Sequence, residues 1–212
     1  MMKTYGIEQI PVINDEGQIV ELQLMGEIIG GNILPNWAVV MAGGRGTRLG
    51  DLTKSVPKPM LLVAGRPILE RIVLHLVGSG IRRIYLSVNY LSELIEDHFG
   101  DGSKFGCEIK YLREDEPLGS GGSLSLLEDK PEHSILVMNG DLVSDFNIRK
   151  LLKQQDTNED SFGTIGLKGY THNVPYGCVD LEGEMIKSLR EKPTLTELIN
   201  TGIYALSPEL IA

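Results

Sequence analysis

Short apolar runs alternate with longer amphipathic segments from Trp37 onward, and this alternation limits the fold more than any other feature of the sequence. The run 37–42 is continuously apolar, as is typical of a strand covered on both faces. Further predicted strands span residues 84–88, 108–112 and 135–138. Predicted helices span residues 68–77, 91–99, 123–128 and 148–155. This order predicts an α/β fold with a doubly wound, mostly parallel sheet that binds ligands at the carboxyl ends of its strands.

The last third of the chain has a different pattern. Predicted strands follow one another there without helices between them, and they span residues 162–168, 176–181, 185–189 and 203–206. This part is therefore expected to form a more mixed sheet.

The first 36 residues are predicted to lie outside this core. Residues 10–13 and 19–24 flank the turn Asn14-Asp15-Glu16-Gly17, a pattern typical of a β-hairpin with a short loop. Apolar and polar residues alternate along 19–24, so one face should be buried, and a lone hairpin needs a partner for such a face. A homo-oligomer is one way to supply it. The predicted parts are a hairpin segment (1–30), a linker (31–36) and a core (37–212).

Composition excludes several classes of function. The 212 residues carry 20 Lys and Arg against 29 Asp and Glu, a formal net charge of −9. This balance argues against partners such as nucleic acid or an anionic membrane. The cysteines are Cys107 and Cys178 only, too few for a disulfide framework or a four-cysteine zinc site. No long apolar segment or signal core occurs, so we expect a cytoplasmic protein.

A glycine-rich turn follows the first apolar run, in the segment Met-Ala-Gly-Gly-Arg-Gly-Thr-Arg-Leu at 41–49. Backbone N–H groups of such a turn can converge on an anion. It matches neither common phosphate loop, because Leu49 replaces the last glycine of Gly-x-Gly-x-x-Gly and no Gly-Lys-Ser/Thr occurs. Asn89 stands where a dinucleotide site would need an acidic residue, so that kind of site is disfavoured.

Lys58 lies between Pro57 and Pro59, which restrict the local backbone. An ammonium held in this way, ten residues after Arg48, would place two cations on one polyphosphate. Either residue alone could equally be an ordinary solvated side chain in a loop. The combination with the glycine turn favours a phosphate site.

Further motifs follow the glycine turn and the Pro57–Met60 segment in order: 116–122 (Glu-Pro-Leu-Gly-Ser-Gly-Gly), 139–141 (Asn-Gly-Asp), 175–177 (Pro-Tyr-Gly), 191–193 (Glu-Lys-Pro) and 200–202 (Asn-Thr-Gly). From about Trp37 to the end, the chain resembles the sugar-1-phosphate nucleotidyltransferases, or nucleotide-sugar pyrophosphorylases, and among them the mannose-1-phosphate guanylyltransferases. The resemblance implies a Rossmann-like, GT-A-like sheet with a mixed sugar-binding subregion. It also implies that the partners are an NTP and a sugar 1-phosphate, that pyrophosphate is released, and that Mg²⁺ is the cofactor.

The resemblance also assigns roles to single residues. The catalytic residues would be Arg48, Lys58 and Asp141, with Asp141 holding the metal at the end of the strand 135–138. The nucleotide would be bound by Ala42, Gly43, Gly44, Gly46, Thr47, Glu114, Gly119 and Ser120. The sugar phosphate would be bound by Gly177, Glu191, Lys192, Asn200 and Thr201. The alternatives are a helix-capping or turn aspartate at Asp141 and a surface ion pair at Glu191 and Lys192.

Glu114 carries the choice of base, because in the family the position five residues before the glycine of Leu118-Gly119 faces the base edge. A carboxylate only accepts hydrogen bonds, which suits the paired N–H donors of guanine and favours GTP. The alternatives are UTP, CTP or dTTP, with Glu114 in a solvated acidic run. A non-catalytic nucleotide-sugar-binding subunit is another, although such a subunit would not need Lys58 at the reacting phosphates.

Residues 9–24 resemble the closing half of a CBS module (the cystathionine-β-synthase type), although Glu21 stands where such modules often have glycine. At the other end, the family usually places a second aspartate ligand of the metal beyond the Asn-Thr-Gly segment. No Asp follows Asp180 in this sequence. We therefore expect these 212 residues to be a fragment that binds an NTP weakly and transfers poorly.

Overall fold

The computed structural model describes residues 9–14, 16–24, 33–44, 46–116, 118–119, 121–158 and 160–211. The chain divides into two compact units. The first unit comprises Met1–Thr164 and Tyr204–Ala212, and the second unit comprises Ile165–Ile203. The boundary between the units falls inside the predicted core 37–212, at the point where the predicted pattern changes to strands without helices.

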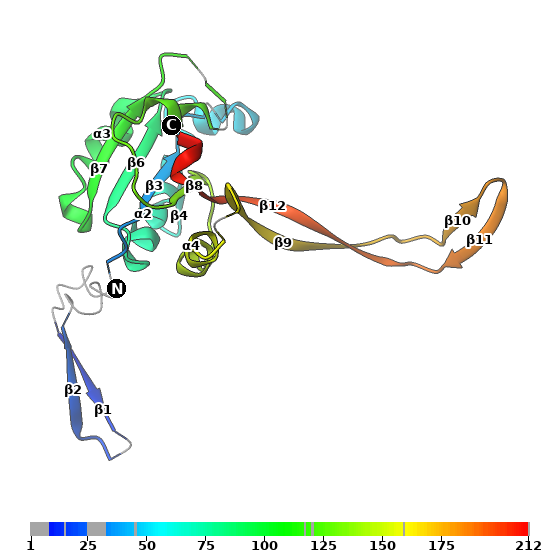
Figure 1. Cartoon of the computed structure of the whole chain (residues 1–212), viewed down its shortest axis with the longest axis horizontal. Helices are drawn as coiled ribbons and strands as arrows, with labels where there is room; N and C mark the ends of the chain where they lie inside the picture. The colour runs from blue at the N-terminus through cyan, green and yellow to red at the C-terminus, as the bar shows by residue number, and fades with distance from the viewer. Residues whose placement is uncertain are drawn as a thin grey trace. The chain divides into compact units, whose positions relative to one another are not determined.

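The sheet of the first unit has the predicted α/β topology. It is built on four parallel strands, β3 (Trp37–Met41), β6 (Arg83–Val88), β7 (Glu108–Arg113) and β8 (Ile135–Asn139). The complete strand order is β7-β6-β3-β8-β12-β9, where β9 is Gly163–Asn173 and β12 is Thr194–Leu206 (Figure 1). The chain thus runs outward from β3 to β7 and then returns across β3 to β8. This reversal makes a topological switch point between β3 and β8, where open α/β sheets bind ligands.

The inner parallel strands β3, β6 and β8 are apolar because both of their faces are buried, whereas the edge strand β7 has exposed Glu108 and Lys110. Ala38, Val39 and Val40 have no exposed surface, and neither do Leu86 and Leu136 on the neighbouring strands. Continuous apolar runs are the pattern that such strands require. The predicted strands of the parallel sheet are confirmed to within one residue at each end.

Helices α2 (Ile68–Gly78), α3 (Ser92–Phe99) and α4 (Ile148–Asp156) lie where the sequence predicts them. The predicted helix at 123–128 is wrong, because the structure has a short 3-10 helix there, η5 (Gly122–Leu126). The glycines before this segment favour no helical nucleus, and a helix of this length gains little from propagation. Among the residues described, no helix is long and apolar enough to span a membrane.

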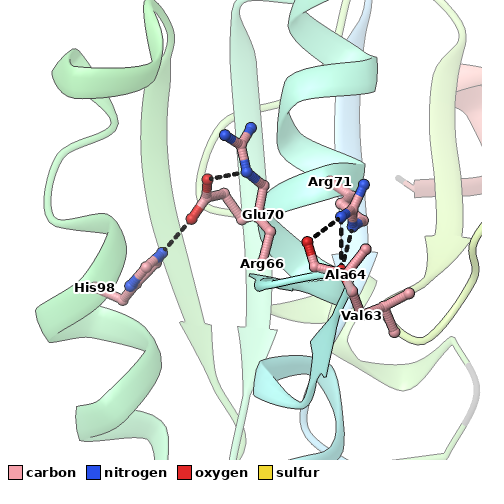
Figure 2. A network of polar contacts seen from close by, with 6 residues as sticks. All are labelled: Val63, Ala64, Arg66, Glu70, Arg71 and His98. Carbon is pink, nitrogen blue, oxygen red and sulfur yellow. Dashed lines mark hydrogen bonds and ion pairs between the residues drawn. The ribbon is translucent and has the colours of Figure 1, made fainter. Parts of the chain in front are cut away.

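A polar network connects α2 with α3 (Figure 2). Glu70 on α2 accepts Nε of Arg66 at 3.2 Å and pairs with Nε2 of His98 on α3 at 2.8 Å. Glu70 is partly buried, so this carboxylate is less screened than one on an open surface.

Arg71, on the next position of α2, stabilises the turn of the small hairpin β4 (Leu62–Val63) and β5 (Arg66–Pro67). Its guanidinium donates to the carbonyl of Val63 at 3.0 and 2.6 Å and to that of Ala64 at 3.2 Å (Figure 2). The connection that follows the Lys58 segment is thereby tied to a buried helix.

The N-terminal hairpin is present as predicted, with β1 (Gln9–Ile13) antiparallel to β2 (Ile19–Leu24). Asn14 closes the turn, because its Oδ1 accepts the N–H of Glu16 at 3.1 Å and that of Gln18 at 2.9 Å. The side chains that alternate along 19–24 beyond Ile19 lie outside the described residues, so the buried face stays a prediction, as does the CBS likeness.

The end of the predicted linker is attached to the first unit. Asn36 is buried, and its side-chain amide donates to the carbonyl of Ser134 at 2.8 Å. The N–H of Leu34 donates to the carbonyl of Gly80 at 2.9 Å. Residues 34–36 are therefore hydrogen-bonded to the first unit and do not form an unattached linker.

The second unit is made of strands alone. It contains the antiparallel pair β10 (Cys178–Glu182) and β11 (Met185–Arg190), together with parts of β9 and β12. Asp180 accepts hydrogen bonds from Ser188 at 2.6 Å and from Arg190 at 2.9 and 3.1 Å, and these bonds lower the pKa of Asp180. β9 and β12 are longer than predicted, since the predicted strands covered only 162–168 and 203–206.

Candidate active site

The ends of β3, β6 and β8 meet so closely that two positions there have little room for a side chain. A Cβ added to Gly140 would lie 2.8 Å from the carbonyl oxygen of Met41, and the N–H of Gly140 donates to that same oxygen at 2.9 Å. A Cβ on Gly43 would lie 3.3 Å from both the backbone N and the Cβ of Asn89. Glycine at 43 and 140 thus lets the chain leave both strands at the switch point.

The glycine turn continues into a 3-10 segment, η2 (Thr47–Thr53). Gly46 has a positive φ of 61°, and a Cβ there would lie 3.0 Å from Cγ2 of Thr53 and 3.1 Å from Cβ of Lys58. The hydroxyl of Thr53 donates to the carbonyl of Gly46 at 3.0 Å. Gly46 therefore lets the turn approach Lys58.

Lys58 begins the short 3-10 helix η3 (Lys58–Met60), which follows Pro57. Its ammonium makes an ion pair with Oδ2 of Asp141, which follows β8. Both side chains are about one-third exposed, at 38% and 32%, so the pair is accessible to a ligand. The structure thus joins two predicted catalytic residues that are 83 positions apart.

Glu114 follows β7, and its carboxylate is bonded through both oxygens. Oε1 accepts the hydroxyl of Ser87, and Oε2 accepts the N–H of Leu118 at 2.9 Å. The backbone N–H of Glu114 donates to Val88 at 3.0 Å, and its carbonyl accepts the side-chain amide of Asn89. This side chain is half-buried and oriented, unlike Asp115 and Glu116, which are exposed.

A cavity of about 630 Å³ lies over these strand ends. From the glycine turn it is lined by the predicted residues Gly43, Gly44, Gly46 and Thr47. From the other segments it is lined by the predicted residues Lys58, Glu114, Gly119 and Asp141. Eight of the predicted nucleotide and catalytic residues therefore share one cavity in the first unit.

Some predicted residues are not brought into this cavity. Ala42 is buried, and its N–H donates to the carbonyl of Ser87 at 2.8 Å, so this amide is used within the sheet. The side chain of Arg48 and all of Ser120 lie outside the described residues, and their roles stay predictions. Asp141 does not cap a helix, because Asn147 caps α4. Asp141 lies in a turn directly after β8, as the alternative of a turn aspartate expects.

The predicted sugar-phosphate residues all belong to the second unit. Glu191 and Lys192 lie 4.0 Å apart and are both exposed. The carboxamide oxygen of Asn200 accepts the N–H of Gly202 at 2.8 Å, and the hydroxyl of Thr201 donates to the carbonyl of Gly166 at 2.7 Å. A Cβ on Gly177 would lie 3.2 Å from Oε2 of Glu191, so this glycine makes room for that carboxylate. Their binding role stays a prediction.

Sequence reasoning missed two polar residues that line the cavity, Ser87 and Asn139. Ser87 is 1% exposed and is the polar residue in the apolar segment of β6. A serine inside an otherwise apolar run, next to the carboxyl end of a strand, is the signal that would have found it. Asn139 ends β8, two residues before Asp141.

The acidic and metal-binding side chains of this cavity are few. Within the described residues, no group of three or more His, Cys, Asp and Glu side chains is placed to hold a metal ion. The oxygen donors at the end of β8 are the carboxylate of Asp141 and the amide of Asn139. Such a set suits Mg²⁺, which uses one or two carboxylates and completes its shell with phosphates and water.

Comparison with known proteins decides the family. The model of the nucleotidyl transferase family matches residues 37–212, from β3 through both units. The chain belongs to the nucleotidyl transferase family. The match agrees with the extent of the resemblance predicted from the motifs.

Similar proteins of this family include several guanylyltransferases. Mannose-1-phosphate guanylyltransferase of Mycobacterium tuberculosis is 34% identical over 180 residues, which cover 82% of this chain and 49% of that protein. The catalytic subunit beta of the Danio rerio enzyme is 37% identical over 185 residues and is covered to 50%. D-glycero-alpha-D-manno-heptose 1-phosphate guanylyltransferase of Campylobacter jejuni is 35% identical and is covered to 76%. The chain thus spans about half the length of the mannose-specific relatives.

Solved structures show the same fold. HddC from Yersinia pseudotuberculosis superposes with a TM-score of 0.62 at 31% identity, over 83% of this chain and 78% of that one. The structure of HddC complexed with GMP-PN gives a TM-score of 0.60 at 29% identity. The mostly parallel sheet with flanking helices is therefore the fold of these nucleotidyltransferases.

Proposed function

We propose that the protein transfers a nucleotidyl group from GTP to a sugar 1-phosphate. The observation that carries the proposal is the cavity at the switch point, which brings the glycine turn, the Lys58–Asp141 pair and Glu114 together. The names of the similar proteins support the choice of reaction, since they are guanylyltransferases of mannose and heptose 1-phosphates. A family member complexed with GMP-PN supports the choice of base.

In the proposed reaction, an oxygen of the sugar 1-phosphate attacks the α-phosphorus of GTP. One P–O bond forms there, and the bond from the α-phosphorus to the oxygen that bridges the α- and β-phosphates breaks. Pyrophosphate then leaves. Catalysis of such a displacement consists mainly of positioning and of neutralising charge. Lys58 would supply the cation where the two phosphates meet, and the amides of Gly43 to Thr47 would hold the leaving pyrophosphate, together with Arg48.

Mg²⁺, bound by Asp141 with phosphate oxygens and water, would supply further neutralisation of the triphosphate. The ion pair between Lys58 and Asp141 keeps both groups at the same place before a nucleotide arrives. When phosphates bind, Lys58 gains anionic partners in place of Asp141. We also propose, from the resemblance, that the sugar phosphate is bound by Gly177, Glu191, Lys192, Asn200 and Thr201. A cytoplasmic location is a separate proposal.

A panel assay tests the function. Pyrophosphate release would be measured on the full-length natural protein with GTP, UTP, CTP and dTTP against a set of hexose and heptose 1-phosphates. We expect release with GTP and with at least one of the sugar phosphates. Faster release with UTP, CTP or dTTP would overturn the choice of base. Binding of GTP without release for any sugar phosphate would favour a non-catalytic nucleotide-binding subunit.

Glu114→Gln tests the base more directly. An amide cannot accept hydrogen bonds from both guanine donors as a carboxylate does, so the binding of GTP should weaken relative to that of UTP and dTTP. A mismatched buried polar pair costs about 1–3 kcal/mol, which predicts a change of about ten- to a hundredfold in the GTP-to-UTP ratio. An unchanged nucleotide preference would mean that Glu114 does not contact the base and is one of several solvated acidic residues.

A further inference from the structure

Ser87 is the buried polar side chain closest to the proposed base contact. It is 1% exposed on β6, where it is in register with Met41 of β3 and Leu112 of β7. Its hydroxyl donates to Oε1 of Glu114. A buried hydroxyl without a partner is costly, so this bond determines which way both side chains point.

The bonds on Glu114 leave a defined number of acceptor positions. A carboxylate has about four lone-pair positions, two on each oxygen. Ser87 uses one on Oε1, and the N–H of Leu118 uses one on Oε2. Roughly one position therefore remains on each oxygen, which matches a base edge with two adjacent N–H donors.

We propose that Ser87 is a positioning residue for guanine selectivity, acting by holding the Glu114 carboxylate with one acceptor position open on each oxygen. The inference rests on the proposed assignment of Glu114 to the base. A free glutamate loses rotamer entropy when it binds a ligand, whereas Glu114 is already ordered by its bonds to β6 and to Leu118. Ser87 thereby acts on the base through Glu114, without touching the reacting phosphates.

Inosine triphosphate provides the critical comparison, because its base keeps the ring N–H and lacks the 2-amino group. The dissociation constants of GTP, ITP and UTP would be measured by calorimetry on the full chain and on its Ser87→Ala variant. We expect Ser87→Ala to weaken the binding of GTP about tenfold, which is the cost typical of losing a hydrogen bond to a charged group. The binding of ITP should weaken less. UTP should be unchanged, so the preference for GTP over ITP falls.

The matched control is Ser123→Ala. Ser123 is also fully buried and near β3, but its hydroxyl contacts Sδ of Met41 at 3.3 Å and not the carboxylate. This variant should keep the GTP-to-ITP ratio. Ser87→Thr, which retains the hydroxyl, should keep it as well and provides a second variant if Ser87→Ala is poorly folded.

Glu114→Ala separates this inference from the proposed function. If Glu114→Ala leaves the GTP-to-ITP ratio unchanged, the base assignment itself is wrong, and the inference falls with it. If Glu114→Ala lowers the ratio while Ser87→Ala does not, only the role of Ser87 is overturned. An equal weakening of GTP, ITP and UTP in Ser87→Ala would show a merely structural role. In the Glu114→Ala background, Ser87→Ala should have no further effect on the ratio.

Discussion

Strands β3, β6 and β8 of the first unit are buried on both faces, whereas β10 and β11 of the second unit are mostly exposed. Val39, Leu86 and Leu136 have no exposed surface, but Met185 is 75% and Leu189 is 67% exposed. In the first unit the side chains form a core, and in the second the backbone pairing of β10 with β11 and polar contacts such as Asp180 with Arg190 hold the strands. A two-stranded ribbon of this kind is marginally stable by itself.

This difference bears on how well each of the two groups of predicted site residues is ordered. At the switch point, Gly43 and Gly140 are held by packed backbone, so the strand ends there have little freedom. In the second unit, Gly177, Glu191 and Lys192 lie in exposed connections between strands, and Asn200 and Thr201 lie on β12. The residues proposed to bind the nucleotide are therefore better preorganised than those proposed to bind the sugar phosphate.

The largest expected effect comes from the ion pair in the first unit. Lys58→Ala and Asp141→Asn should each lower turnover by at least about a hundredfold, because loss of one charge-stabilising group costs on the order of 10²–10³ in rate. Pyrophosphate release and thermal unfolding would be measured together, with Lys54→Ala as the control. Lys54 also makes an ion pair, with Asp51, but this pair is exposed. Rates near those of the unaltered protein would remove the substituted residue from the mechanism.

Hydrogen exchange tests the contrast between the units directly. Amides of β3, β6 and β8 should be protected by at least about a hundredfold more than those of β10 and β11, because exposed strands open locally at low free energy. Mass spectrometry of exchanged peptides would measure this. Equal protection in the two units would mean that the strands of the second unit are buried in solution, and the contrast in burial would then be wrong.

Gly140→Ala should destabilise the first unit at the switch point. The added Cβ would meet the carbonyl oxygen of Met41 at 2.8 Å and Cα of Ala42 at 3.2 Å, and neither atom belongs to a flexible side chain. We expect a loss of about 2 kcal/mol in the free energy of unfolding, in the range of overpacked buried sites. Gly44→Ala is the matched control, since nothing lies within 4 Å of its added Cβ. A cost equal to that of the control would show that the strand ends are not rigidly packed.

The smallest expected effect concerns Tyr85 in the core of the first unit. Among the described residues, its hydroxyl is the buried side-chain oxygen that has no hydrogen-bond partner, and burial raises the pKa of Tyr85. Tyr85→Phe removes this unsatisfied group, so stability should stay the same or rise by up to about 1 kcal/mol. Denaturant unfolding would measure the change. A clear loss of stability would show that the hydroxyl has a partner in solution.

Several parts of the fold could be predicted from the sequence because their signals are local. The apolar run at 37–42 and the helix at 68–77 required only the spacing of apolar residues and a glycine stop. The 3-10 helix η5 was missed because its leucines have a helical spacing while the preceding glycines prevent a full helix. The extra length of β9 and β12 was missed because exposed pairing uses backbone hydrogen bonds and needs no apolar pattern.

The sequence by itself determined which segments are buried strands and which residue types stand at their carboxyl ends, because burial and turn chemistry depend on neighbouring residues. The tertiary structure decided which of these ends meet. Lys58 pairs with Asp141 because β3, which precedes the Lys58 segment, lies beside β8, and Ser87 pairs with Glu114 because β6 lies beside β7 in the sheet. The order of strands depends on packing between distant segments, and no local pattern in the sequence specifies that a buried serine on one strand will orient a carboxylate on the next.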